Sequence, residues 1–177
     1  MIPEVFIENW RKTVPWQMTE QIQQDLMISR ALVDLYNDPH VKDALVFRGG
    51  TALNKLFINP PARYSEDIDF VQKNADPIGQ TIDAIRALLK PWLGDPKWKI
   101  TQRSAKLIYK YESVNKMPAK LKIEINTTEH FHTCLTSSTE DAKVPPVASK
   151  SSTMRTFSPL PRESRWISTV AWPYSRS

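Results

Sequence analysis

Two carboxylates at alternate positions of a predicted strand are the residues of this chain best placed to do chemistry. Asp67 and Asp69 flank Ile68 in an apolar run. Because residues i and i+2 of a strand point to the same face, we expect the two carboxylates to project together. Adjacent carboxylates repel each other unless a cation lies between them. Hard oxygen ligands of this kind suit Mg²⁺, which completes its shell with water and substrate phosphates.

A glycine pair upstream predicts a phosphate-binding turn. Gly49 and Gly50 follow one apolar strand and open a helix. Glycine lets the backbone approach a ligand closely, and the free N–H groups at a helix start attract an anion. Thr51 and Lys55 are four residues apart, on one side of that helix. We therefore expect the hydroxyl and the ammonium to reach toward the same phosphate.

A second strand offers a third carboxylate. Over residues 120–127 the apolar residues alternate with polar ones, which predicts one core face and one polar face. Glu124 lies on the polar face of this strand, between Lys122 and Asn126. An exposed Glu124 paired with Lys122 is the alternative interpretation.

The elements that must position these residues form a single α+β domain over residues 1–143. Hydrophobic periodicity and Pro or Gly signals predict helices at 20–36, 51–57 and 76–91, and strands at 44–47, 67–72, 97–103, 107–113 and 120–127. Pro39 is expected to stop the first of these helices, and Ser104-Ala105 reads as a weak turn. Residues 144–177 hold eight Ser and five Pro, which predicts an irregular C-terminal tail.

Composition restricts the class of protein. The chain is 41% hydrophobic and 24% charged, as is typical of a globular domain, and no apolar run approaches the roughly 20 residues of a membrane span. One cysteine in 177 residues favours a reducing compartment, the cytoplasm. The last 28 residues carry four of the five net positive charges, so the net charge is weak evidence for a nucleic-acid groove in the domain.

The two motifs resemble those of a known family. Gly-Gly-Thr-Ala-Leu-x-Lys within residues 47–55, followed by Arg-x-Ser-x-Asp-Ile-Asp-Phe over residues 63–70, is similar to the AbiEii-type nucleotidyltransferase toxins of the DNA polymerase beta-like superfamily. The resemblance extends to about Thr128. It implies a nucleotidyltransferase fold, a small mixed β-sheet flanked by helices. It also implies metal-dependent transfer of a nucleotide from an NTP, and a toxin paired with a separate antitoxin, as in abortive infection.

The resemblance also implies a role for each motif residue. Asp67 and Asp69 would hold Mg²⁺, and Glu124 is the candidate for the third metal ligand. The β- and γ-phosphates would be held by the phosphate-binding turn and its neighbours, namely Gly49, Gly50, Thr51, Lys55, Arg63 and Ser65. The acceptor would be an RNA, such as tRNA, or a protein hydroxyl.

Two other functions are compatible with parts of the pattern. A nucleotide-sugar glycosyltransferase also uses an acid-x-acid pair, which explains the aspartates but not the upstream glycine-threonine turn. A catalytically inactive remnant that binds nucleotide or a protein partner would keep both motifs. The glycosyltransferase alternative predicts a different ligand, since an NTP and not a UDP-sugar should stabilise a nucleotidyltransferase.

The C-terminal residues raise the question of completeness. Family members continue after the third carboxylate strand into a mostly helical region with further basic residues. Here Ser164-Arg165-Trp166 still resembles the family, but residues 168–173 show no helical period. We therefore expect an incomplete toxin with little or no transferase activity. A naturally short variant whose tail covers the same surface is the alternative.

Overall fold

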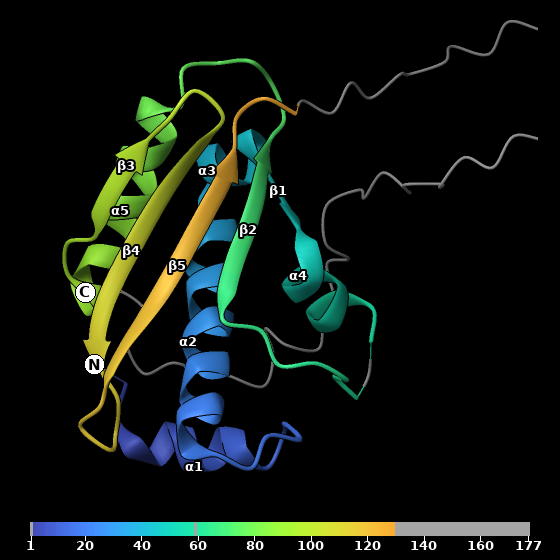
Figure 1. Cartoon of the computed structure of the whole chain (residues 1–177), viewed down its shortest axis with the longest axis vertical. Coiled ribbons are helices and arrows are strands. Elements are labelled where there is room, and N and C mark those ends of the chain that lie inside the picture. The colour runs from blue at the N-terminus through green and yellow to red at the C-terminus, as the bar shows by residue number, and fades with distance from the viewer. Residues whose placement is uncertain (1, 59, 130–177) are drawn as a thin grey trace, which may run out of the picture. The chain divides into compact units, whose positions relative to one another are not determined.

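The computed structural model describes residues 2–58 and 60–129 (Figure 1). The predicted tail, its boundary at residue 144 and the family-like Ser164-Arg165-Trp166 lie outside these residues. None of the described helices combines the length and apolar character that crossing a bilayer requires. The elements in chain order are α1 (Glu4–Arg11), α2 (Thr19–Tyr36), α3 (Pro39–Ala44), β1 (Leu45–Arg48), α4 (Gly49–Leu56), β2 (Asp67–Gln72), α5 (Gly79–Leu93), β3 (Lys97–Ile100), β4 (Ser104–Glu112) and β5 (Pro118–Asn126).

The strands form one mixed sheet in the order β1-β2-β5-β4-β3. Strand β2 pairs with β5 in parallel, and every other neighbouring pair is antiparallel. The chain leaves β2 through α5 and the β3–β4 pair before it returns as β5, which supplies the long connection that a parallel pair needs. The predicted mixed sheet flanked by helices is confirmed.

Helices cover one face of this sheet. Figure 1 shows α2 and α5 on the same side of the strands, with α2 running behind β5 and β2. Residues 22–28 of α2 are all buried, so the helix is covered on nearly every side. The strands turn their apolar positions toward it, and these are almost fully buried: Ile68, Phe70, Leu121, Ile123 and Ile125. The alternate positions, which carry the polar residues, therefore face away from α2.

The helix predicted over residues 20–36 ends at Tyr36, as expected. Pro39 also has a role that was not predicted: it opens α3, where the side chain of Asp38 accepts a hydrogen bond from the Val41 N–H at 2.9 Å. Proline fits that first helical position because it needs no donor there. Ser104 belongs to β4 rather than to a turn, and the chain reverses just before it.

One buried glutamine joins α2 to three strands. The Nε2 of Gln24 donates to the carbonyl oxygens of Glu66, at 2.9 Å, and Lys120, at 3.1 Å, and its Oε1 accepts from the Tyr111 hydroxyl. Gln24 is only 5% exposed. Glu66 directly precedes β2, and Lys120 lies near the start of β5. The Gln24 side chain therefore fixes the N-terminal ends of the two strands that carry the predicted carboxylates.

Replacing the amide of Gln24 with an apolar group of similar length should destabilise the fold. We expect Gln24→Met to lower the free energy of unfolding by about 2 to 4 kcal/mol, since two carbonyls and one hydroxyl lose a buried partner. Urea unfolding followed by circular dichroism measures the change. Gln80→Met, at an exposed position of α5, is the matched control and should change stability by less than about 0.5 kcal/mol. Equal losses in the two variants would contradict the assigned role.

Candidate active site

The predicted carboxylates lie on adjoining positions of two neighbouring strands. Asp67 and Asp69 project from β2 on the side opposite α2, because Ile68 between them is completely buried. The parallel register pairs Asp67 with Lys122 and Asp69 with Glu124. The sheet therefore brings Glu124 beside the aspartate pair, although it lies 55 residues after Asp69 in the sequence.

Lysine side chains contact two of these carboxylates. The Nζ of Lys122 lies 2.7 Å from Oδ2 of Asp67 and 3.5 Å from Oε2 of Glu124. The Nζ of Lys106, on β4, lies 3.0 Å from Oε1 of Glu124. Within residues 2–58 and 60–129, no three His, Cys, Asp or Glu side chains are arranged as a metal-binding group. A metal-ligand role for Glu124 therefore stays a prediction, and its side chain here holds two lysines.

The charges around Asp69 favour binding of a cation. Burial, followed by the negative charge of Asp67, raises the pKa of Asp69, and the positive charges of Lys122 and Arg48 only partly oppose this. Glu124 behaves differently: burial acts to raise its pKa, but Lys106 and Lys122 lower it on balance. Asp69 forms no ion pair with any residue that the structure describes. A hard divalent cation fits this arrangement. Asp67 already contacts one cation, the ammonium of Lys122, and a nearby cation would stabilise the charged form of Asp69.

The start of α4 lies against Asp69. Gly49 has a φ of +79°, and a Cβ at this residue would lie 2.7 Å from Oδ2 of Asp69. Both the backbone conformation and the space therefore require glycine. The side chain of the N-cap residue, Arg48, makes no capping hydrogen bond to the first turn of α4. The N–H groups of this turn thus lie next to the carboxylates. A phosphate bound by the turn would therefore lie beside a metal bound by the carboxylates, which is the arrangement expected from the sequence.

The side chains of Thr51 and Lys55 are placed differently from the expectation. The hydroxyl of Thr51 is buried and donates to the Asp67 carbonyl oxygen at 2.7 Å. The Nζ of Lys55 lies 2.9 Å from both Oδ1 of Asp25 and Oγ of Ser29, on α2. Thr51 thus fastens α4 to β2, and Lys55 fastens it to α2. A direct phosphate contact for either side chain stays a prediction.

Residue Asn54 was missed by the sequence analysis. Its Nδ2 donates to the Gly50 carbonyl oxygen at 2.8 Å, and its Oδ1 accepts from the Arg63 N–H at 3.2 Å. The Arg63 guanidinium lies near the glycine pair, with Nη1 3.7 Å from where a Cβ of Gly50 would be. Ser65 lies half-buried in the segment that leads into β2. The signal for Asn54 was its position one helical turn after Gly50.

Lys122 has a larger role than the sequence indicates. The strand pattern predicts it as a partner of Glu124, whereas its shorter contact is with Asp67. The strand alternation already placed Lys122 on the polar face. The register with β2, which decides its partner, is a property of the sheet.

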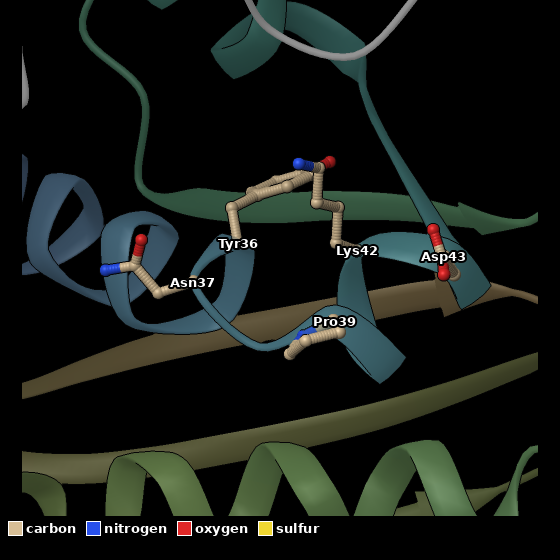
Figure 2. A pocket seen from close by; sticks show the side chains of 5 residues that line it. All are labelled: Tyr36, Asn37, Pro39, Lys42 and Asp43. Atoms are coloured by element: carbon tan, nitrogen blue, oxygen red, sulfur yellow. The ribbon is translucent and has the colours of Figure 1, made fainter. Parts of the chain in front are cut away.

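A surface pocket elsewhere has no part in this site. It lies where α2 meets α3, and Figure 2 shows the side chains that line it, Tyr36, Asn37, Pro39, Lys42 and Asp43. None of them belongs to the carboxylate strands or to the phosphate-binding turn.

Comparison with known proteins covers the glycine turn and all three predicted carboxylates. The family model described as "Nucleotidyl transferase AbiEii toxin, Type IV TA system" matches residues 30–159, nearly three quarters of the chain. Among curated proteins, none matches. The match includes both motifs and all the strands that carry the carboxylates.

Solved structures show similarity in fold. The crystal structure of JHP933 from Helicobacter pylori is 22% identical with a TM-score of 0.50, covering 67% of this chain and 48% of that one. A putative nucleotidyltransferase from H. pylori is 21% identical, with a TM-score of 0.49 and coverage of 66% and 49%. MenT4, a nucleotidyltransferase toxin from Mycobacterium tuberculosis, is 16% identical, with a TM-score of 0.44 and coverage of 72% and 44%. The chain spans about half the length of these proteins, and the first comparison supports the fold.

The buried position of Lys55 predicts a cost in stability when its ion pair is broken. The side chains of Lys55 and Asp25 are 14% and 10% exposed, and Asp25 also accepts from the indole N–H of Trp10. We expect Lys55→Met to cost about 2 to 4 kcal/mol, because Asp25 keeps its charge without the cation.

A double-mutant cycle with Asp25→Asn and Lys55→Met isolates the pair. We expect a coupling energy of about 1 to 3 kcal/mol from urea unfolding. Additive losses would mean that the pair does not stabilise the fold. NTP affinity, measured on the folded single variants, tests the separate prediction that Lys55 contacts phosphate: a loss in Lys55→Met alone would support it.

The different partners of the two aspartates predict opposite effects on stability. Asp69→Asn removes a carboxylate whose charged form the fold disfavours, so at neutral pH it should leave the melting temperature unchanged or raise it. Asp67→Asn loses the partly exposed contact with Lys122 and should cost up to about 1 kcal/mol. Thermal melts at low ionic strength compare the two variants with the unmodified protein.

The pH dependence of this comparison has a definite sign. Because the pKa of Asp69 is raised in the folded state, the full cost in stability is present above that pKa, and it is gone once the pH lies below the pKa of the unfolded chain. Any advantage of Asp69→Asn should therefore shrink as the pH falls through the pKa, where the native carboxyl also becomes neutral. A large loss of stability in Asp69→Asn at neutral pH would contradict this description of the site.

Proposed function

The chain belongs to the AbiEii nucleotidyltransferase toxin family, and we propose that it takes part in metal-dependent transfer of a nucleotide from an NTP to a hydroxyl acceptor. One observation carries the proposal: the first residue of α4, Gly49, lies so close to Asp69 that no residue with a Cβ fits at this position. A triphosphate bound by the N–H groups of α4 would therefore lie beside the carboxylates. Nucleotidyl transfer requires this juxtaposition.

We assign the metal to the aspartate pair. Asp67 and Asp69 would hold Mg²⁺ with their side-chain oxygens, and Glu124 is the proposed third ligand. When bound, Mg²⁺ would supply neutralisation of the charge that develops on the phosphate oxygens. The position of Asp69, which is half-buried and without an ion-pair partner among the described residues, supports this assignment.

The start of α4 would hold the phosphates. The N–H groups of Gly49, Gly50 and Thr51 would donate to a phosphate, and the positive end of the helix dipole would stabilise its negative charge. The guanidinium of Arg63, held near Gly50 by Asn54, would add a charge-assisted contact. Ser65 and Lys55 are proposed as further phosphate contacts, and for Lys55 this requires its ammonium to leave Asp25.

The family description supports a toxin with an antitoxin, and the acceptor is a further part of the proposal. We propose a toxin of a type IV toxin-antitoxin system, with an RNA such as tRNA or a protein hydroxyl as acceptor and a cognate antitoxin as partner. The reducing cytoplasm expected from the single cysteine would be its location. Lysines at positions 106, 110, 120 and 122 share the face of the carboxylates, and they favour a polyanionic acceptor such as RNA over a neutral one.

A nucleotide-binding remnant without transfer activity is the second candidate. The observation that favours it is the occupation of Asp67 and Glu124 by lysines. Such a protein would bind an NTP at α4 and transfer nothing. No contact in the described structure favours a nucleotide-sugar glycosyltransferase.

Incubation with each radiolabelled NTP, Mg²⁺ and total cellular RNA and protein tests the proposal. An active chain should label one acceptor class, and Asp67→Asn and Asp69→Asn should each lower that transfer by at least about 100-fold, since an oxygen ligand of the metal is lost. The incomplete toxin expected from the C-terminal sequence would label little or nothing. Glu112→Gln is the matched control: it neutralises an exposed acid on the same sheet face and should keep transfer.

The labelling experiment, together with thermal melts in the presence of an NTP or a UDP-sugar, separates the two candidate functions. Substantial transfer by either aspartate variant would contradict the assignment. Protection of the fold by an NTP, without any labelled acceptor, would favour the remnant. Protection by a UDP-sugar instead of an NTP would contradict both.

A further inference from the structure

Lys122 is placed to compete with a metal ion for the carboxylates. Building on the proposed function, we propose that its ammonium is a built-in counter-cation of the site, so that a divalent cation competes with it for Oδ2 of Asp67. The lysine would thereby set how tightly the protein binds a free divalent cation.

The contact is specific to one aspartate. The Nζ of Lys122 lies 2.7 Å from Oδ2 of Asp67, a charge-assisted hydrogen bond, and 3.5 Å from Oε2 of Glu124. The two side chains of the shorter pair are 27% and 37% exposed, so a cation from solvent can reach them. An oxygen that accepts from the ammonium at this distance cannot also coordinate a metal in the same direction.

The position of Lys122 is fixed by the sheet. It lies directly opposite Asp67 in the parallel pair β2–β5, and the residues that follow each of them, Ile68 and Ile123, are completely buried. A shift of one residue would turn these isoleucines to the polar face, so the register is firmly specified. The ammonium therefore faces Asp67 whenever the sheet is folded.

Neighbouring cations on the same face have other contacts. Lys106 pairs with Glu124, and Arg48 pairs with Glu129. Lys110 is exposed, two residues further along β4 from Ile108, which is the neighbour of Lys122. Among the described residues, Lys122 is the one cationic side chain within ion-pair distance of either predicted aspartate ligand.

Glu124 gives the displaced ammonium a second position. Because Nζ is already 3.5 Å from Oε2, a small change of the Lys122 side chain would move the ammonium from Asp67 to Glu124. A cation that arrives with a triphosphate also brings the negative charge that offsets the nearby ammonium. The inference therefore predicts weak binding of the free cation and tighter binding of the same cation together with an NTP.

Titration with Mn²⁺, followed by the electron paramagnetic resonance signal of the free ion, tests the competition without any activity assay. Mn²⁺ is a suitable probe because it prefers the same oxygen ligands as Mg²⁺. We expect Lys122→Met to bind Mn²⁺ about tenfold more tightly than the unmodified protein, the effect of one lost charge-assisted contact. Lys110→Met, which removes a charge from the same face without touching Asp67, should change the affinity by less than about twofold.

Each outcome decides the matter. Equal tightening in Lys122→Met and Lys110→Met would mean a general charge effect and would overturn the inference, as would unchanged or weaker binding in Lys122→Met. Lys122→Gln, checked with the first variant by circular dichroism, guards against a fold defect and should show the same tightening. In Asp67→Asn/Lys122→Met the tightening should disappear, because the contested ligand is gone.

The proposed function and this inference can fail separately. If the unmodified protein binds Mn²⁺, Asp67→Asn weakens that binding and Lys122→Met does not tighten it, the metal site stands and the competition is wrong. If neither the unmodified protein nor Lys122→Met binds Mn²⁺, with or without NTP, both are wrong.

Discussion

The parallel pairing of β2 with β5 is the contact on which the candidate site depends. It places Asp67 opposite Lys122 and Asp69 opposite Glu124, residues that are 55 positions apart in each case. The pairing is held from behind by the buried face of the same two strands against α2. Since the side chains alternate along a strand, the apolar contacts that bury one face also determine which charged groups meet on the other.

The second constraint is the attachment of α4 to this sheet. The helix is short, and an isolated helix of this length would be marginal in water. Three contacts hold it: Gly49 lies against Asp69, Thr51 donates to the start of β2, and Lys55 pairs with α2. Motif residues that resemble a phosphate-binding set thus also fix the helix whose N–H groups would meet the phosphate. Stability and ligand binding are in this way combined in the same few residues.

Charge balance on the polar face explains how three carboxylates fit beside one another. Lys106 and Lys122 neutralise Glu124, and Lys122 also contacts Asp67, whereas Asp69 depends on more distant charges. A face with acids alone would be destabilised by repulsion. A face with lysines alone would offer no ligand for a metal. The mixture gives a site that is stable as folded and still attracts a further cation at Asp69.

The local features of this protein follow from short stretches of its sequence. The alternation around Asp67 and Asp69, the glycine pair and the amphipathic strand of Glu124 are set by periods of two and by backbone sterics, which neighbouring residues specify. The tertiary structure decided the partners: Lys55 meets Asp25 rather than open solvent, and Lys122 meets Asp67. These contacts follow from helix packing and strand register, which depend on residues far apart in the chain and leave no periodic signal near the side chains that they bring together.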